Sequence, residues 1–191
     1  MAVVQKKERY TYGDYLNWPE EERWELIDGV PYAMSPAPPR RHQEILGELY
    51  RQFANHLLDK ACKVYLAPFD VRLPEGNEKD EEVKTVVQPD LVVVCDRSRL
   101  DERGCRGSPD LVIEVVSPTT LKRDLREKFY LYEKAGIKEY WVVNPAEKNV
   151  LVFVLGEDKK YGRHEIYFED EQVRVKVLEG LTIDLREVFK E

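Results

Sequence analysis

Two acidic residues stand beside or within apolar segments that are predicted to be buried strands. Asp90 directly precedes Leu91–Val94, and Glu114 lies between Ile113 and Val115. Continuous apolar runs of this kind, each preceded by a proline, are typical of central strands. Burying a carboxylate costs several kcal/mol, roughly the penalty for any buried charge, unless a cation or hydrogen-bond donors compensate for it. Two carboxylates on adjacent strands are therefore candidate ligands of a divalent metal ion.

Such a pair supports metal-assisted hydrolysis of a phosphodiester. Mg²⁺ (or Mn²⁺) takes oxygen ligands and keeps several waters, so that one or two carboxylates suffice. The ion polarises the scissile phosphate and lowers the pKa of a bound water, which attacks in line. Two structural alternatives stay open. Asp90 is also typical of the turn that begins a strand after a proline, and Glu114 also suits a structural salt bridge.

The segment that follows the Glu114 strand is predicted to be a helix. It begins at Thr119 or Thr120, which are good N-cap residues, and it ends near Ala135, before Gly136. With an advance of about 100° per residue, one arc of this helix is apolar. That arc contains Leu121, Leu125, Phe129, Leu131, Tyr132 and Ala135.

Lys128 and Asp124 fall within the same apolar arc, on the side that is expected to face the sheet. A lysine in that position needs an anionic partner, and we expect Glu114 to be that partner because the strand–helix connection is short. Lys128 is then a candidate to steady the attacking water or the charge that develops on the phosphate, with Asp124 orienting it. The alternative is a lysine that extends to solvent and pairs with Asp124 at a spacing of four. Lys122, at the edge of the arc, is a second candidate lysine.

The order and spacing of these motifs resemble the PD-(D/E)XK nuclease superfamily, and specifically its Uma-type restriction endonuclease family. The resemblance extends from the hairpin motif at residues 25–29 to the strand motif at residues 139–145. It implies that Asp90 and Glu114 are the acidic residues of the active site. It also implies that the backbone carbonyl of Val115 is a third metal ligand.

The resemblance also identifies one departure and one further candidate. The family's lysine lies two residues after the second carboxylate, and this position holds Val116 here. Lys128 is the proposed replacement, because it is predicted to approach Glu114 from the following helix. The family tends to carry a histidine where His42 begins the first long helix, although a histidine on a core-facing side is usually a structural residue.

The order of elements predicts a single domain over residues 1–191 with a mixed α/β fold. An N-terminal helix and hairpin (1–38) turn at Asp28-Gly29, and a nuclease core (39–145) contains a helix over 41–59 and strands over 62–73, 85–95, 109–116 and 139–143. C-terminal strands (146–191) follow at 150–155, 164–168 and 173–177, with a short helix at 184–189. The resemblance implies a restriction-endonuclease-like core.

Charge and cysteine content bound the function further. The net charge of −7 argues against an extended nucleic-acid-binding surface. Three cysteines without zinc-ligand spacing are expected to be reduced thiols. No apolar stretch has the length of a membrane span and no signal peptide pattern begins the chain, so a soluble cytoplasmic protein without membrane contact is expected.

The resulting hypothesis is a Mg²⁺-dependent endodeoxyribonuclease that cleaves DNA. The main alternative is a catalytically inactive module on the same fold, which binds nucleic acid or protein. Val116 and the acidic net charge favour that alternative. A nuclease that acts on RNA is a third hypothesis, and a homodimer would suit the cutting of a duplex.

Overall fold

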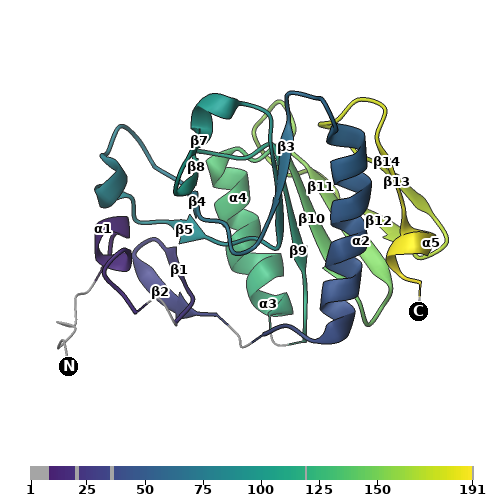
Figure 1. Ribbon diagram of the computed structural model, residues 1–191, viewed down its shortest axis with the longest axis horizontal. Coiled ribbons are helices and arrows are strands. Elements are labelled where there is room, and N and C mark those ends of the chain that lie inside the picture. Colours follow the sequence, from purple (N-terminus) through teal and green to yellow (C-terminus); the bar gives the residue numbers. More distant parts are fainter. Residues whose placement is uncertain (1–8, 20–21, 35–36, 119, 191) are drawn as a thin grey trace.

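A computed structural model of the chain describes residues 9–19, 22–34, 37–118 and 120–190. Its strands form two six-stranded sheets and one two-stranded sheet, and helices cover both faces of the sheet in the middle of the molecule (Figure 1). The predicted mixed α/β fold is therefore confirmed. The expectation that Thr119 caps a helix lies outside the described residues.

The central sheet contains the two segments that carry the candidate carboxylates. Its strands are β3 (Lys63–Leu66), β6 (Leu91–Val94), β9 (Leu111–Val115), β10 (Glu139–Asn144), β11 (Asn149–Val154) and β12 (Glu165–Phe168). Their order is β12-β11-β10-β9-β6-β3. β9 is parallel to β10 and antiparallel to β6. All residues of β6 and β9 are buried, which explains their continuous apolar sequences.

The second six-stranded sheet includes the N-terminal hairpin. Its strands are β1 (Trp24–Ile27), β2 (Val30–Ala33), β4 (Val71–Arg72), β5 (Val86–Val87), β7 (Leu100–Asp101) and β8 (Gly104–Arg106). The hairpin turns at Asp28 and Gly29, whose φ angles of 49° and 76° are both positive, as a type I′ turn requires. This confirms the predicted hairpin, and β5 joins it to the rest of the sheet by pairing with β1.

Helix α2 (Arg40–Leu57) packs along one face of the central sheet. Its buried stripe is Ile45, Leu46, Leu49, Phe53 and Leu57, as the helical periodicity predicted. Tyr50, which follows Leu49 on the same helix, is 36% exposed. Helix α5 (Leu185–Val188) and the two-stranded sheet of β13 (Gln172–Arg174) and β14 (Thr182–Asp184) lie beside α2, while the short helix α1 (Tyr12–Tyr15) lies near the hairpin (Figure 1).

The opposite face of the central sheet is covered by the helical segment that follows β9. It consists of α3 (Leu121–Arg123), a π-helical turn η3 (Asp124–Lys128) and α4 (Phe129–Ala135), and it ends at Gly136 in the left-handed conformation. A π turn contains more residues per turn than an α-helix. Helix positions that were calculated at 100° per residue therefore differ from the positions that the residues take around the helix axis. Leu125, which was predicted to be in the core, lies within this turn and is 37% exposed, so that prediction was wrong.

Two predicted strands are each divided between the two large sheets. The segment 62–73 forms β3 and β4, and the segment 85–95 forms β5 and β6. Pro68 interrupts the first segment and Pro89 the second. Proline has no N–H group to donate to a strand ladder, so the chain leaves one sheet at each proline and joins the other. The predictions of single strands over these segments were therefore wrong.

The expectation of three reduced thiols was also wrong. Cys62 and Cys95 form a disulfide with an S–S distance of 2.06 Å, whereas Cys105 is a buried free thiol. β3 and β6 are antiparallel with Lys63 opposite Val94, and one further step of that register places the two cysteines opposite each other. The two cysteines can form a disulfide because of this strand register. The number of cysteines in the sequence does not reveal the register.

No helix in the described part of the chain is both long enough and apolar enough to cross a membrane.

Candidate active site

The strand register brings the two candidate carboxylates together. β6 and β9 pair with Leu91 opposite Ile113, and one further step of this antiparallel register places Asp90 opposite Glu114. Residues directly opposite each other on one face have Cβ atoms about 5 Å apart. Glu114 therefore lies on the face of the central sheet that the α3–η3–α4 segment covers, and Asp90, which directly precedes β6, lines the same cavity at the end of the strand pair.

Asp90 is held in place by neighbouring groups on β9 and α2. Its Oδ2 atom accepts a hydrogen bond from the backbone N–H of Val115 at 2.7 Å. The same oxygen lies 3.3 Å from Nε2 of His42, the third residue of α2. His42 Nδ1 is buried and has no hydrogen-bond partner among the described residues. His42 therefore lies next to Asp90, and its role at the site stays a prediction.

Glu114 is almost completely buried, with 5% of its surface exposed. Its Oε1 atom accepts hydrogen bonds from Nζ of Lys128 at 2.8 Å and from the hydroxyl of Tyr132 at 2.7 Å. Burial raises the pKa of Glu114 to about 8, and the nearby Asp124 and Asp90 carboxylates act in the same direction. A bound divalent cation would offset this effect and favour the ionised carboxylate.

Lys128 extends toward the sheet, as the helical periodicity predicted. Its side chain is only 2% exposed, and Nζ lies 2.8 Å from Glu114 Oε1 and 2.9 Å from Glu25 Oε1. Asp124 Oδ1 is farther away, at 3.9 Å, so pairing with Asp124 at the surface does not describe this lysine. Burial alone would lower the pKa of Lys128, but the Glu114 and Glu25 carboxylates raise it above its ordinary value. The ammonium is therefore charged and tightly held.

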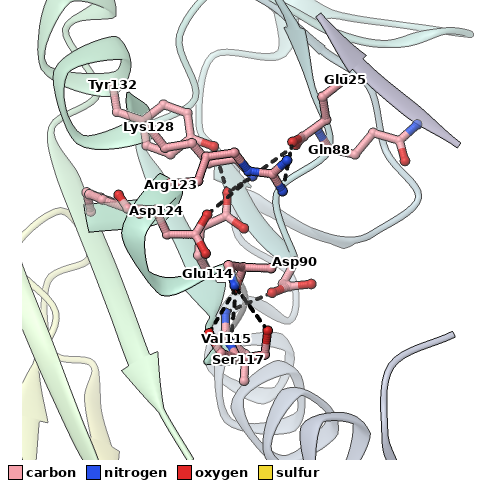
Figure 2. Close-up of polar contacts among 12 residues, drawn as sticks. Glu25, Gln88, Asp90, Glu114, Val115, Ser117, Arg123, Asp124, Lys128 and Tyr132 are labelled. Atoms are coloured by element: carbon pink, nitrogen blue, oxygen red, sulfur yellow. Dashed lines mark hydrogen bonds and ion pairs between the residues drawn. The ribbon is translucent and has the colours of Figure 1, made fainter. Parts of the chain in front are cut away.

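Glu25 is the site residue that sequence reasoning missed. It lies on β1 and is fully buried. Its Oε1 atom accepts hydrogen bonds from Lys128 and, at 3.0 Å, from the backbone N–H of Gln88. Burial opposes ionisation of this carboxyl, but Lys128 and the Gln88 N–H hold its pKa below the usual value. Figure 2 shows Lys128 between Glu25 on the hairpin side and Glu114 on the central strand.

A sequence signal for Glu25 was available. It stands between Trp24 and Leu26 in an apolar strand, just as Glu114 stands between Ile113 and Val115. The resemblance had included Glu25 only as part of a hairpin motif.

Asp124 and Arg123 complete the polar wall on the helical side. Asp124 is 3% exposed, and burial raises the pKa of its carboxyl. The Arg123 Nη2 atom lies 3.6 Å from Glu25 Oε2, and its guanidinium also lies over the ring of Tyr32 at 5.8 Å. Arg123 was not predicted, because its position on the helix appeared to face solvent.

A cavity of about 320 Å³ is lined by most of these groups, although not by Glu25 or Tyr132. It is formed where the N-terminal hairpin, the start of α2, the ends of β6 and β9 and the α3–η3 segment meet. All of the predicted site residues line it, namely Asp90, Glu114, Val115, Lys128, His42 and Asp124. The structure thus brings together residues that the sequence placed on four separate elements.

The donor groups of this cavity fit a hydrated Mg²⁺ or Mn²⁺ ion. In the described residues, no group of three or more His, Cys, Asp or Glu side chains has the arrangement of a complete metal cage. Magnesium does not require one, because one or two carboxylates and several waters complete its octahedral shell. Asp90 and Glu114 supply two carboxylates at the cavity wall, and Val115 lines the same wall.

The remaining candidates lie elsewhere. Val116 is 4% exposed and packs in the apolar cluster beneath the α3–η3–α4 segment, while Lys122 is exposed and does not line the cavity. Asp110, at the other end of β9, accepts a hydrogen bond from the Cys95 N–H at 2.8 Å and an ion pair from Lys138 at 2.7 Å. These contacts are structural, and Asp110 does not line the cavity.

Known proteins resemble this chain in fold and in sequence. A putative nuclease of the DUF820 group from Anabaena variabilis has a similar fold, with a TM-score of 0.73, 21% identity and coverage of 94% of this chain and 97% of that one. An uncharacterized protein from Synechocystis is 27% identical over 148 residues, which are 76% of this chain and 74% of the relative. A family model named Uma2 and described as "putative restriction endonuclease" matches residues 12–186. Because that match spans nearly the whole chain, the protein belongs to the Uma2 family.

Proposed function

We propose that this protein is a divalent-metal-dependent endodeoxyribonuclease, in which Asp90 and Glu114 hold the ion and Lys128 acts at the reacting phosphate. One observation carries the proposal. Two carboxylates, Asp90 directly before β6 and Glu114 on the adjacent β9, line one cavity, and a buried lysine hydrogen-bonds Glu114 at 2.8 Å. The Uma2 match and the nuclease-like fold support the same reaction class.

The ion, when bound, supplies Lewis-acid polarisation of the phosphodiester and a water of lowered pKa. Asp90 and Glu114 would hold it, and the Val115 carbonyl would be a further oxygen ligand. The N–H of Val115 orients the Asp90 carboxylate, because it donates to Oδ2. These groups are set in the sheet before substrate arrives, which limits the reorganisation needed during the reaction.

Lys128 takes the role of the lysine that the Uma-type motif would place at Val116. Glu25 and Glu114 orient its ammonium and keep it charged. In that state it stabilises the negative charge that develops on the phosphate and fixes the attacking water by donating a hydrogen bond. Asp124 and His42 support the site from either side, the first near Lys128 and the second beside Asp90.

The test is cleavage of plasmid, single-stranded and branched DNA with Mg²⁺ or Mn²⁺. Asp90→Asn, Glu114→Gln and Lys128→Met are expected to lose cleavage, whereas Asp110→Asn and Lys122→Ala keep it. Absence of cleavage by the unaltered protein with both ions and all DNA forms would refute the proposal. Cleavage of RNA but not of DNA would refute the substrate assignment alone.

A binding module without catalysis is the second candidate. The observation that favours it is the environment of Lys128, whose ammonium is already held by two carboxylates. This candidate predicts DNA binding that is unchanged by Lys128→Met and no cleavage under any of the conditions above.

A further inference from the structure

The cavity of the candidate site also contains a cation that has no carboxylate partner among the described residues. Arg23 immediately precedes β1 and lines the cavity. Its guanidinium donates from Nε and Nη2 to Oε1 of Gln88 at 3.1 and 2.8 Å. Lys128 and Arg123, the other two basic side chains of the wall, both lie within 4 Å of a Glu25 oxygen. Arg23, which is exposed to solvent, therefore differs from them in having no anionic partner among the described residues.

The partner of Arg23 is a neutral amide whose orientation is determined by its other contacts. Gln88 Nε2 donates to Oδ1 of Asp70 at 2.9 Å and to the hydroxyl of Tyr15 at 3.0 Å. Because Asp70 accepts hydrogen bonds, the NH₂ end of the amide must face it, and the carbonyl end must face Arg23. Gln88 thus holds the guanidinium in place without neutralising it.

Arg23 lines the same cavity as the two carboxylates that are proposed to bind the metal ion. Gln88 and Asp90 are separated only by Pro89, and both line the same cavity as Arg23. Arg23 uses Nε and Nη2 on one oxygen, and a guanidinium carries five N–H donors in a fixed fork. An oriented arginine with remaining donors and no anionic partner is suited to bind a phosphate oxygen.

We propose that Arg23 binds a backbone phosphate of DNA next to the phosphate that is cleaved. The inference rests on the proposed nuclease function and adds the residue that recognises the neighbouring phosphate. In a protein of net charge −7, a polyanionic substrate needs such a local cation beside the acidic pair. The site would then favour oligonucleotides over small phosphodiesters that contain a single phosphate.

Binding of fluorescein-labelled single-stranded and duplex DNA tests this inference by anisotropy, with Ca²⁺ in the buffer and salt as the variable. Arg23→Gln removes the charge and keeps a polar side chain, whereas Arg23→Lys keeps the charge. Loss of one phosphate contact is expected to reduce the slope of log K against log[salt] by about 1. Affinity at low salt is expected to fall about tenfold. Arg174→Gln, an exposed arginine on β13 outside the cavity, is the matched control.

The expected result is a reduced slope for Arg23→Gln and slopes close to that of the unaltered protein for Arg23→Lys and Arg174→Gln. An unchanged slope for Arg23→Gln, with thermal unfolding confirming that the variant is folded, overturns the inference and leaves Arg23 as a partner of Gln88. Absence of salt-dependent DNA binding by the unaltered protein also overturns it.

Cleavage assays separate this inference from the proposed nuclease function. Arg23→Gln is expected to raise the KM for oligonucleotides and to leave hydrolysis of bis(p-nitrophenyl) phosphate unchanged, because that substrate has no second phosphate. An equal loss on both substrates contradicts the inference while the nuclease proposal stands. An Arg23-dependent salt slope without any cleavage refutes the nuclease proposal alone.

Discussion

Lys128 Nζ lies 2.8 Å from Glu114 Oε1, and this contact joins the helical segment to the central strand of the sheet. The same ammonium reaches Glu25 on the hairpin at 2.9 Å. One buried lysine therefore connects its own helical segment and the preceding strand to a hairpin that is 103 residues away in the sequence. The candidate site and the packing of the hairpin against the core share this contact.

Removal of the Lys128 charge is expected to destabilise the fold as well as the site. Lys128→Met leaves the buried, ionised Glu25 without its cation, a situation that costs about 3–5 kcal/mol. Urea unfolding measures the change. Lys122→Met, an exposed lysine on the same helical segment, is expected to stay within about 0.5 kcal/mol of the unaltered protein. Equal stability of the two variants would contradict the ion-pair role of Lys128.

Asp90 and Asp110, each of which follows a proline, are expected to respond differently to the same substitution. Asp90→Asn should abolish binding of Mn²⁺ in titration calorimetry, because it removes one of two carboxylates at the cavity. Asp110→Asn should keep metal binding and lower the free energy of unfolding by about 1–3 kcal/mol, because Asp110 accepts the Cys95 N–H and pairs with Lys138. Loss of metal binding in Asp110→Asn would show that the roles have been assigned the wrong way round.

The raised pKa of Glu114 predicts that the metal-free protein loses stability as the pH rises. The folded carboxyl holds its proton up to about pH 8, whereas the unfolded one releases it near its ordinary value of 4.5. Between these values the folded state binds more protons, so the free energy of unfolding falls with rising pH, by up to about 1.4 kcal/mol per unit. Unfolding at several pH values with a chelator measures this trend.

Glu114→Gln is the control for the pH trend, because glutamine does not titrate. Its stability profile should be flatter than that of the unaltered protein across the same window. Addition of Mg²⁺ to the unaltered protein should reverse part of the loss, since a cation favours the ionised carboxylate. Identical pH profiles for the two proteins would contradict the assignment of the trend to Glu114.

Reduction of the Cys62–Cys95 disulfide is expected to weaken the fold without removing it. The bond closes a loop with a sequence separation of 33, and a crosslink of that size contributes about 2–4 kcal/mol. Unfolding with and without dithiothreitol measures the difference. Cys62→Ser combined with Cys95→Ser should show the same loss and no further response to reductant. A response of that double variant would point to another origin.

Local sequence patterns were sufficient to predict most of the helices and strands on which the site residues lie. The apolar runs of β6 and β9, the buried stripe of α2 and the inward position of Lys128 all follow from periodicity, which depends only on neighbouring residues. Asp90 and Glu114 were identified in the same way, because a carboxylate in an apolar strand is costly unless a partner or an ion compensates for it.

Only the tertiary structure decided which of these groups meet. Lys128 and Glu25 are separated by 103 residues, and Arg23 and Gln88 by 65, so no local pattern reports either contact. The prolines that divide two predicted strands determine which sheet each half joins, and the π turn changes which helix residues face the core. The sequence thus determined the chemical groups and the faces on which they lie. Long-range strand pairing determined that they converge on one cavity, because register and sheet order are properties of the packed chain.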